Sequence, residues 1–371
     1  MNSSCCSSVV IFSLADSSKN PTVFTLPILI PPPQSLAATA TVLAGLAAVA
    51  SALPSHTEQE YQFLFKHYIA QHNKHYHVDE VHVRFANFKA NVDLVAAHNA
   101  KAAAHTSSYK LAVNQFADMS KEDFRAKYLG FKFVDQAHLR AKNSAQLNNI
   151  SLPASVDGNA KGAVTPVKNQ GQCGSCWAFS TTGSVEGAWF LAKGQLVSLS
   201  EQQLVDCSQA QGNQGCSGGL MDQGFQYIIT NGGICTEAAY PYTAADGTCQ
   251  TTCTKAATVS SFTDVTVGSE PALTAAIAQQ PVSVAIEADQ SVFQFYSSGV
   301  LDDESCGTQL DHGVLAAGYG HDSTVNKDFY QVKNSWGVAW GQGGYINIVR
   351  NVNGDSARQC GITSAASWPK I

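Results

Sequence analysis

The chain has 371 residues, with 22 Lys and Arg against 28 Asp and Glu, which gives a net charge of −6 at neutral pH. This mildly acidic balance, without a basic patch, argues against nucleic acid as a partner. The sequence also shows no internal repeats and no heptads, which excludes a solenoid or a coiled coil.

Residues 1–52 resemble a leader with an apolar, Ala-rich core at 36–52. The core ends in Ala50-Ser51-Ala52, a small-residue pattern typical of signal-peptide cleavage, and its roughly 17 residues are short for a membrane span. The sequence therefore predicts cleavage after Ala52 and entry into the secretory pathway. Because 35 residues precede this core, with Lys19 as their only positive charge, a signal anchor or an incorrect start codon remains an alternative.

A helical unit is expected at 53–131, followed by a polar linker at 132–151 that lacks periodicity and favours proteolytic cleavage. Six residues of this unit recur at spacings of three or four, which would put them on one face of a helix. They are Glu80, Arg84, Phe88, Asn91, Val95 and Asn99. Residues 53–151 carry a net charge of +3 and residues 152–371 one of −9, so these two parts should attract each other.

Nine of the eleven histidines lie between His56 and His138. Histidine titrates near pH 6.5, which suggests that acid could loosen this unit by protonating buried histidines and interface carboxylates. Solvated surface histidines without such a role are the alternative.

The segment from Cys173 to Cys176 leads into an apolar pattern at 175–193 that stops at Gly194, which predicts a helix. A thiol in the first turn of a helix is favoured as the thiolate, and a neighbouring imidazolium can lower a cysteine pKa from about 8.5 to roughly 3–4. Cys176 is therefore a candidate nucleophile. A redox C-x-x-C motif or a disulfide cysteine is the alternative, but the redox motif requires a preceding strand, and 168–171 looks like a loop.

A base for this nucleophile is available downstream. His312 precedes a strand-like run at 313–319, and Asn334 follows another at 329–333. Either residue alone would most often be structural. Together with Cys176 they form the set that a Cys-His catalytic pair and an orienting amide require.

With these motifs the chain resembles the papain-like cysteine peptidases of the cathepsin L type. The motif C-G-[SA]-C-[WY] with His and Asn roughly 130–150 residues downstream is typical of this family, and the spacings here are 136 and 158. The resemblance covers about residues 58 to 370, including the six-residue helix face and the Ala112 to Asp118 stretch of the family's propeptide. Further matching segments lie at 164–170, 198–207, 216–221 and 343–345.

The resemblance implies an α+β fold in which 152–371 forms a papain-like peptidase domain of two lobes, preceded by a helical inhibitory propeptide at 53–131. One lobe would be helical and supply Cys176, and the other an antiparallel β-barrel-like lobe supplying His312. The sequence agrees with this order. Helical patterns occur at 175–193 and 220–231, and strand-like runs follow at 281–288, 313–319, 329–333 and 345–349.

The resemblance also implies catalytic roles. Cys176 would attack the peptide, His312 would protonate the leaving amine, and Asn334 would orient the imidazole. The side-chain amide of Gln170 and the backbone N–H of Cys176 would form the oxyanion hole. Trp336 would shield the His–Asn hydrogen bond.

Further positions are implied to bind substrate. The backbone of two glycines would pair with an extended peptide, because glycine lets another backbone approach closely. An apolar pocket would receive the residue second before the scissile bond and would favour Leu or Phe over Arg. These substrate-binding positions are Gly218, Gly219, Leu220, Met221, Ala285, Leu310, Asp311, Trp336 and Ala365.

Three disulfides follow from the same resemblance. They are Cys173 to Cys216, Cys207 to Cys249 and Cys306 to Cys360. A fourth bridge between Cys235 and Cys253 is expected, with two free thiols as the alternative. Bridges indicate an oxidising, secretory environment.

The expected function is that of a cysteine endopeptidase made as a zymogen, active at acidic pH in a lysosome- or vacuole-like compartment or after secretion. Its partners would be protein and peptide substrates, its own propeptide and cystatin-type inhibitors. We expect a monomer that needs no metal and no cofactor. A catalytically retired relative that binds or stores, and a transglutaminase-like acyl transferase, are the alternatives.

Overall fold

The computed structural model describes residues 55–132, 152–351 and 359–371. The predicted leader at 1–52 and, apart from Lys132, the predicted linker at 132–151 lie outside these residues. The chain divides into two compact units between Asp93 and Leu94.

The first unit contains α1 (Glu58–Gln71) and the first half of α2 (Val81–Ala103). A reciprocal capping box, in which Thr57 bonds the Glu60 backbone and the Glu60 carboxylate bonds the Thr57 N–H, starts α1. An aromatic core joins the helices, with the Phe65 ring 5.2 Å from that of Phe88. The predicted helix is confirmed from its second face residue onward, since Glu80 directly precedes α2.

The second unit begins with the rest of α2, then β1 (Tyr109–Leu111) and α3 (Lys121–Tyr128). Asn99 ties α2 to β1, because its side chain donates to the Leu111 carbonyl at 2.8 Å and accepts from the Leu111 N–H at 3.0 Å. Asn99, the last residue of the predicted helix face, is thus used to hold the following strand. α3 is capped by the Ser120 side chain.

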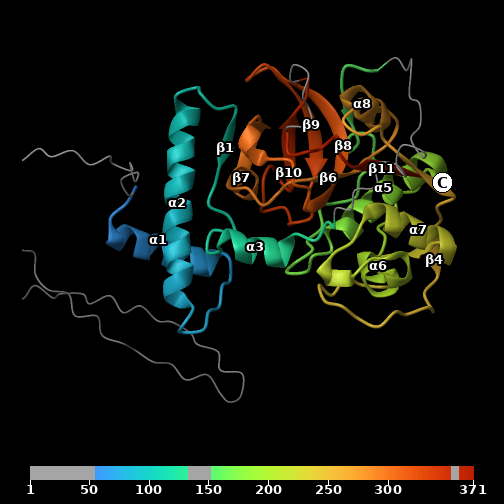
Figure 1. Cartoon of the computed structure of the whole chain (residues 1–371), viewed down its shortest axis with the longest axis horizontal. Helices are drawn as coiled ribbons and strands as arrows, with labels where there is room; N and C mark the ends of the chain where they lie inside the picture. Colours follow the sequence, from blue (N-terminus) through green and yellow to red (C-terminus); the bar gives the residue numbers. More distant parts are fainter. Residues whose placement is uncertain (1–54, 133–151, 352–358) are drawn as a thin grey trace, which may run out of the picture. The chain divides into compact units, whose positions relative to one another are not determined.

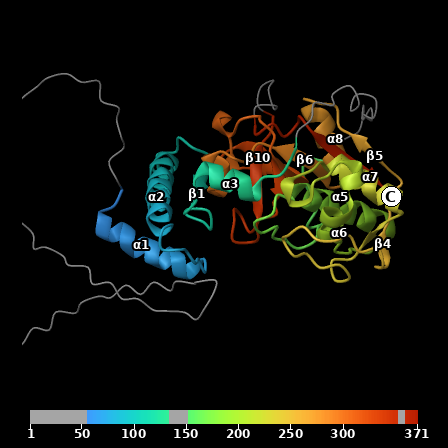
Figure 2. The ribbon, with the colours of Figure 1, turned by 60° about the horizontal axis from the view of Figure 1, so that its bottom comes forward.

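A helical lobe follows, made of α5 (Cys176–Lys193), α6 (Glu201–Cys207) and α7 (Met221–Asn231). These helices lie together in both ribbon views, coloured green to yellow (Figures 1 and 2). The predicted helix at 175–193 is confirmed, with Ser175 as its N-cap, and it ends where Gly194 adopts a positive φ of 75°. The prediction at 220–231 is confirmed in the same way, with Leu220 as the N-cap.

The remaining elements include a β lobe, whose strands from β6 onward are drawn in orange and red in Figures 1 and 2. Its sheet has the order β1-β7-β10-β9-β8-β6-β11-β5, with β2 added alongside β8. The strands are β2 (Val156–Asp157), β5 (Ser261–Asp264), β6 (Val282–Ile286), β7 (Tyr296–Leu301), β8 (His312–Asp322), β9 (Lys327–Lys333), β10 (Tyr345–Val349) and β11 (Ala366–Lys370). The helices are α8 (Glu270–Gln279) and α9 (Ser291–Gln294). A separate two-stranded sheet pairs β3 (Ile234–Cys235) with β4 (Lys255–Ala257).

Strand pairing sets the position of the candidate site. All sheet pairs are antiparallel apart from β10 with β7. In the β8–β9 pair Leu315 lies opposite Lys333, so the start of β8 and the end of β9 lie at the same end of the strand pair. His312 opens β8 and Asn334 directly follows β9. This register brings together two residues that are 22 positions apart in the sequence.

A buried ion network lies behind the site. The Lys168 ammonium contacts the carboxylates of Glu186 at 2.9 Å and Glu201 at 2.5 Å, and both acids are about 1% exposed. Burial alone would lower the pKa of Lys168, but the two carboxylates raise it above its ordinary value. Removing one partner of such a group would leave a buried charge unpaired, which typically costs about 3–5 kcal/mol. The network therefore anchors the loop before Gln170 to α5 and α6.

Candidate active site

Cys176 is the first residue of α5 and is completely buried. It is the one free cysteine among the described residues. Its Sγ accepts a hydrogen bond from the backbone N–H of Gly313 at 3.4 Å. Because Gly313 follows His312 directly, this bond brings the start of β8 to the start of α5.

The imidazole of His312 is held by two side chains. Its Nε2 lies 2.8 Å from Oδ1 of Asn334. The ring of Trp336 stacks on it, with 4.7 Å between centroids and an interplanar angle of 30°. Trp336 is itself 1% exposed. Nδ1 of His312 is buried without a hydrogen-bond partner, which leaves it available for proton exchange.

Burial governs the charge of both groups in this proform. It raises the pKa of the Cys176 thiol to about 11, although N–H groups of Gly313 and Gly130 act in the opposite direction. It also lowers the pKa of His312 to about 4, against the effect of Asn334. Burial in the proform therefore favours the uncharged thiol and the uncharged imidazole. The physical reason is that residues of the prosegment, the chain before residue 152, keep both groups away from water.

Gln170 is fixed by three hydrogen bonds of its side chain. Its Oε1 accepts from the Ser335 hydroxyl at 2.6 Å, and its Nε2 donates to the carbonyl oxygens of Cys173 and Tyr128, each at 2.9 Å. Tyr128 belongs to the prosegment. The Tyr128 carbonyl of the prosegment thus accepts a hydrogen bond from the amide group that was expected to serve the oxyanion hole.

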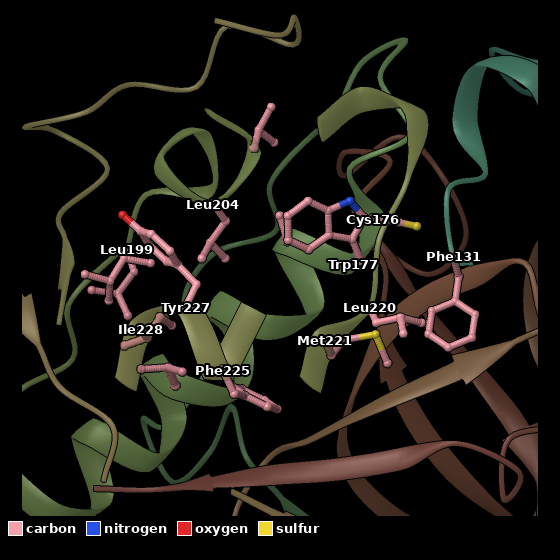
Figure 3. Close-up of a cluster of buried hydrophobic side chains, with 14 of the residues drawn as sticks. Phe131, Cys176, Trp177, Leu199, Leu204, Leu220, Met221, Phe225, Tyr227 and Ile228 are labelled. Carbon is pink, nitrogen blue, oxygen red and sulfur yellow. The ribbon is translucent and has the colours of Figure 1, made fainter. Parts of the chain in front are cut away.

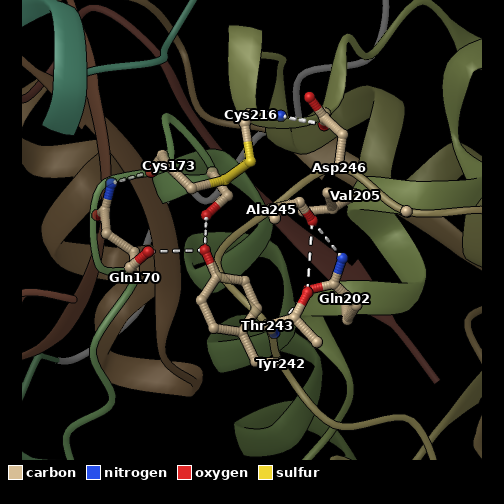
Figure 4. Close-up of a disulfide and its surroundings, with 12 residues drawn as sticks. Gln170, Cys173, Gln202, Val205, Cys216, Tyr242, Thr243, Ala245 and Asp246 are labelled. Carbon is tan, nitrogen blue, oxygen red and sulfur yellow. Dashed lines mark hydrogen bonds between the residues drawn. A yellow bond between two sulfur atoms is a disulfide. The ribbon is translucent and has the colours of Figure 1, made fainter. Parts of the chain in front are cut away.

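Tyr242 contacts both ends of the loop that runs from Gln170 to Ser175 (Figure 4). Its hydroxyl donates to the carbonyl of Gln170 at 2.8 Å and lies 2.6 Å from the Ser175 hydroxyl. The disulfide between Cys173 and Cys216 closes the same region. The backbone on either side of Cys176 is consequently held at several points.

The prosegment crosses the site as an extended strand. The Gly219 N–H donates to the Gly130 carbonyl at 2.8 Å, and the Lys132 N–H donates to the Gly219 carbonyl at 3.2 Å. On the other side, the Phe131 N–H donates to the Asp311 carbonyl at 2.9 Å. A side chain on Gly218, which has a φ of +114°, would overlap with the Gly130 carbonyl. Close backbone contact therefore requires glycine at 218.

Phe131 fills the predicted apolar pocket. It is 5% exposed and packs in a buried cluster that contains all five predicted pocket residues. These are Leu220, Met221, Ala285, Leu310 and Ala365. Figure 3 shows the Phe131 ring beside Leu220 and Met221. The structure thus brings the predicted pocket residues together and places a phenylalanine side chain among them.

Several site residues were not anticipated from the sequence. Phe131 and Tyr128 belong to the prosegment, and the apolar stretch Leu129-Gly130-Phe131 before a polar linker was the available signal. Ser335, which holds Gln170, lies within the Asn-Ser-Trp motif and could have been assigned from it. Phe293 packs edge-on against Trp336 at 5.7 Å, and no sequence signal marked it.

Four disulfides are present in the part of the chain that the structure describes. The three bridges implied by the resemblance are Cys173–Cys216, Cys207–Cys249 and Cys306–Cys360. Cys235 is joined to Cys253, rather than left with it as a pair of free thiols.

The expectation of buried, acid-sensing histidines in the prosegment is not met. In residues 55–132 every histidine is exposed or half-buried, and His138 lies outside the described residues. Buried carboxylates do occur beside the prosegment, including Asp289, which is 5% exposed.

The described residues hold neither a metal-binding cluster nor a membrane-spanning helix. No group of three or more His, Cys, Asp or Glu side chains is arranged to hold a metal ion. None of the helices placed by the structure is long and apolar enough to span a bilayer.

Comparisons with known proteins agree with this geometry. Residues 152–370 match the family described as papain family cysteine protease, and residues 65–124 match the cathepsin propeptide inhibitor domain. Cysteine proteinase 5 of Dictyostelium discoideum is 45% identical over 88% of this chain and 97% of its own length. Cathepsin L1 of Drosophila melanogaster is 47% identical over 81% of this chain and 83% of its own.

Solved structures give the same result. Digestive procathepsin L 3 of the Tenebrio molitor larval midgut is 42% identical, has a TM-score of 0.75, and covers 84% of this chain and 99% of its own. The precursor of stem bromelain is 37% identical with a TM-score of 0.73, and covers 84% of this chain and 99% of its own. The fold is the expected α+β papain-like fold of two lobes with a propeptide. The chain therefore belongs to the papain family of cysteine proteases, as a zymogen that carries a cathepsin-type propeptide.

Proposed function

We propose that the chain, once its prosegment is removed, is an endopeptidase that uses Cys176 and His312 as a thiolate–imidazolium pair. The observation that carries this proposal is the convergence of three parts. Cys176 starts α5, Gly313 donates to its Sγ, and Asn334 bonds the neighbouring His312. Removal of the prosegment admits water and relieves the burial that keeps both groups neutral, while the α5 N-terminus favours the thiolate.

In this mechanism the Cys176 thiolate attacks the scissile carbonyl carbon. The resulting oxyanion is stabilised by Nε2 of Gln170 and the backbone N–H of Cys176, and removal of one such donor typically costs about 2.7–4 kcal/mol. Collapse of the tetrahedral intermediate breaks the C–N bond, and the imidazolium of His312 gives its proton to the leaving amine. Water, deprotonated by the neutral imidazole, then hydrolyses the thioester and regenerates the pair.

Substrate selectivity in the proposal rests on the pocket occupied by Phe131. Its floor consists of Ala285 and Ala365, both fully buried and uncharged. An aromatic or branched apolar side chain can bury its surface there, whereas an arginine would lose hydration without gaining a carboxylate partner. We therefore infer a preference for Leu or Phe second before the scissile bond.

Zymogen processing completes the proposal. We infer an inhibitory unit at 53–131, a cleaved linker at 132–151 and a mature, monomeric enzyme at 152–371, open to cystatin-type inhibitors once the cleft is free. Four disulfides support passage through an oxidising secretory route. Activity at acidic pH, in a lysosome- or vacuole-like compartment or after secretion, belongs to the same proposal.

The experiment is to activate the purified proform at acidic pH with a reductant and treat it with an epoxysuccinyl inactivator. We expect one adduct, on Cys176 by mass spectrometry, and loss of hydrolysis of peptides with Leu or Phe second before the cut. Peptides with Arg there should be cut much more slowly. The Cys176→Ser variant, processed in trans, is the control and should neither react nor cleave. A correctly processed wild-type chain without labelling or activity would overturn the proposal in favour of a retired relative.

A further inference from the structure

Asp289 is a buried carboxylate of the peptidase domain whose ion-pair partners, among the described residues, both come from the prosegment. It follows β6, and its side chain is 7% exposed. Its Oδ1 lies 3.3 Å from the ammonium of Lys121, and its Oδ2 lies 3.6 Å from the guanidinium of Arg125. Both cations project from α3 and are themselves about half exposed or more. Removing the prosegment would thus expose a carboxylate that has lost both its partners.

The segment that carries this carboxylate is bonded to Asp311, the residue before His312. The backbone N–H of Ala288 donates to Oδ1 of Asp311 at 2.8 Å, and Asp311 directly precedes His312. Oδ2 of Asp311 is buried without a hydrogen-bond partner, and the residue is 7% exposed. Glu287 differs, because Gln290 and the Gln309 N–H satisfy its carboxylate. Asp289 therefore remains as an acidic spot near the start of β8, since among the described residues no cation of the peptidase domain forms an ion pair with it.

The path of the prosegment shows on which side of the scissile bond this spot lies. Gly130 pairs with Gly219, and Phe131 then enters the pocket for the residue second before the cut. α3 carries Lys121 and Arg125 and precedes Gly130 in the chain. It packs on the side of the site opposite this pocket, where Phe124 contacts the Trp336 ring edge-on at 5.2 Å. The amine that leaves after cleavage must approach His312 to receive its proton. That amine belongs to the first residue after the scissile bond.

We propose that Asp289 makes this protease select Lys or Arg as the first residue after the scissile bond. In the proform, Lys121 and Arg125 occupy the position that this substrate side chain takes in the active enzyme. A cation there regains the ion pair that Asp289 loses on activation, whereas a substrate carboxylate would be repelled by Asp289. The proposal rests on the proposed function, since it concerns the same catalytic site.

The test uses the activated enzyme and three fluorogenic peptides that are identical apart from Lys, Ala or Glu as the first residue after the cut. We expect wild-type kcat/KM to be at least about fivefold higher for Lys than for Glu, as a partly exposed ion pair allows. Asp289→Asn should reduce this ratio to below about twofold. Raising the salt concentration should reduce the wild-type ratio in the same direction.

Asp322→Asn is the matched control, because Asp322 ends β8, the strand that His312 begins. It should keep the wild-type Lys to Glu ratio. An unchanged ratio in Asp289→Asn, or no Lys preference in an active wild type, would overturn this inference and leave the proposed function intact. Absence of cleavage of all three peptides by correctly processed wild type would instead refute the proposed function, and with it this inference.

Discussion

The backbone nitrogen of Gly219 lies 2.8 Å from the carbonyl oxygen of Gly130, so the prosegment pairs with the stretch of backbone that is expected to receive substrate. The same segment fills the specificity pocket with Phe131 and takes the Gln170 amide with the Tyr128 carbonyl. One continuous stretch of the propeptide thus covers three of the positions that are expected to bind substrate. These contacts combine hydrogen bonds of Gly130 and Tyr128 with the packing of the Phe131 side chain.

Gly130→Ala should weaken this occupation, because an added Cβ would overlap with the carbonyl oxygen of Gly174. Overpacking of this kind typically costs about 1–3 kcal/mol, which corresponds to roughly 5- to 150-fold faster access to the site. The measurement is the rate at which a small alkylating reagent modifies Cys176 in the intact zymogen. Ala126→Ser, at an exposed position of α3, is the control and should label at the wild-type rate. Equal rates for both variants would contradict this account of the inhibition.

Asn334→Ala should lower kcat by about 10- to 100-fold with a smaller change in KM. The variant loses the 2.8 Å hydrogen bond to Nε2 of His312, and a hydrogen bond to a charged group contributes about 1.5–3 kcal/mol. The measurement is steady-state hydrolysis of a Leu- or Phe-containing peptide over a pH series. A variant with normal kcat and a raised KM would show that Asn334 acts in binding rather than in orienting the imidazole.

The reactivity of Cys176 should depend on pH very differently before and after activation. In the proform burial raises the pKa of Cys176 to about 11 and lowers that of His312 to about 4, so both groups are neutral between these values. The intact zymogen should therefore alkylate slowly from pH 5 to 8, with a rate that rises towards alkaline pH. The activated enzyme should react rapidly throughout this range, because solvent and His312 stabilise the thiolate. Rapid, pH-independent alkylation of the intact zymogen would contradict a neutral pair.

Asp311 should make the proform more stable at acidic than at neutral pH. Burial raises the pKa of Asp311 from 3.8 to about 7, aided by the charges of Asp289 and Glu287. Between about pH 4 and 7 the folded chain binds more protons at this group than the unfolded chain, so the free energy of unfolding falls as pH rises. The shift corresponds to at most about 4 kcal/mol across this window.

The measurement is urea unfolding at pH 4.5 and 7, with Cys176→Ser in the background to prevent processing. Asp311→Asn cannot ionise and should show the smaller loss of stability between the two values. If parent and variant lost the same free energy, Asp311 would not be the group responsible.

The Cys235–Cys253 bridge should stabilise the helical lobe measurably. It closes a loop with a sequence separation of 18, for which chain-entropy arguments give about 3 kcal/mol. The double variant Cys235→Ser, Cys253→Ser should unfold at a lower urea concentration while retaining peptide cleavage at low temperature, since the bridge lies outside the catalytic residues. An unchanged unfolding midpoint would mean that the unfolded chain gains little freedom from its loss.

Much of the site could be predicted because its signals are local. The apolar period after Ser175 and the glycine at 194 are sufficient to define α5, and the thiol at its first residue follows from that helix start. The strands that carry His312 and precede Asn334 were likewise marked by their apolar runs. Helix periods, caps and turn residues act over a few positions, so the sequence displays them directly.

Proximity between distant residues was decided only by the tertiary structure. The register of β8 against β9 brings His312 to Asn334, and Phe131 reaches its pocket across a long stretch of chain. The pKa of Cys176 also depends on the tertiary structure, because burial in the proform raises it. The sequence by itself determined the elements and the reactive groups, since these depend on short-range patterns. Packing and desolvation depend on which segments come together, and these determined which groups meet, which are covered and which are charged.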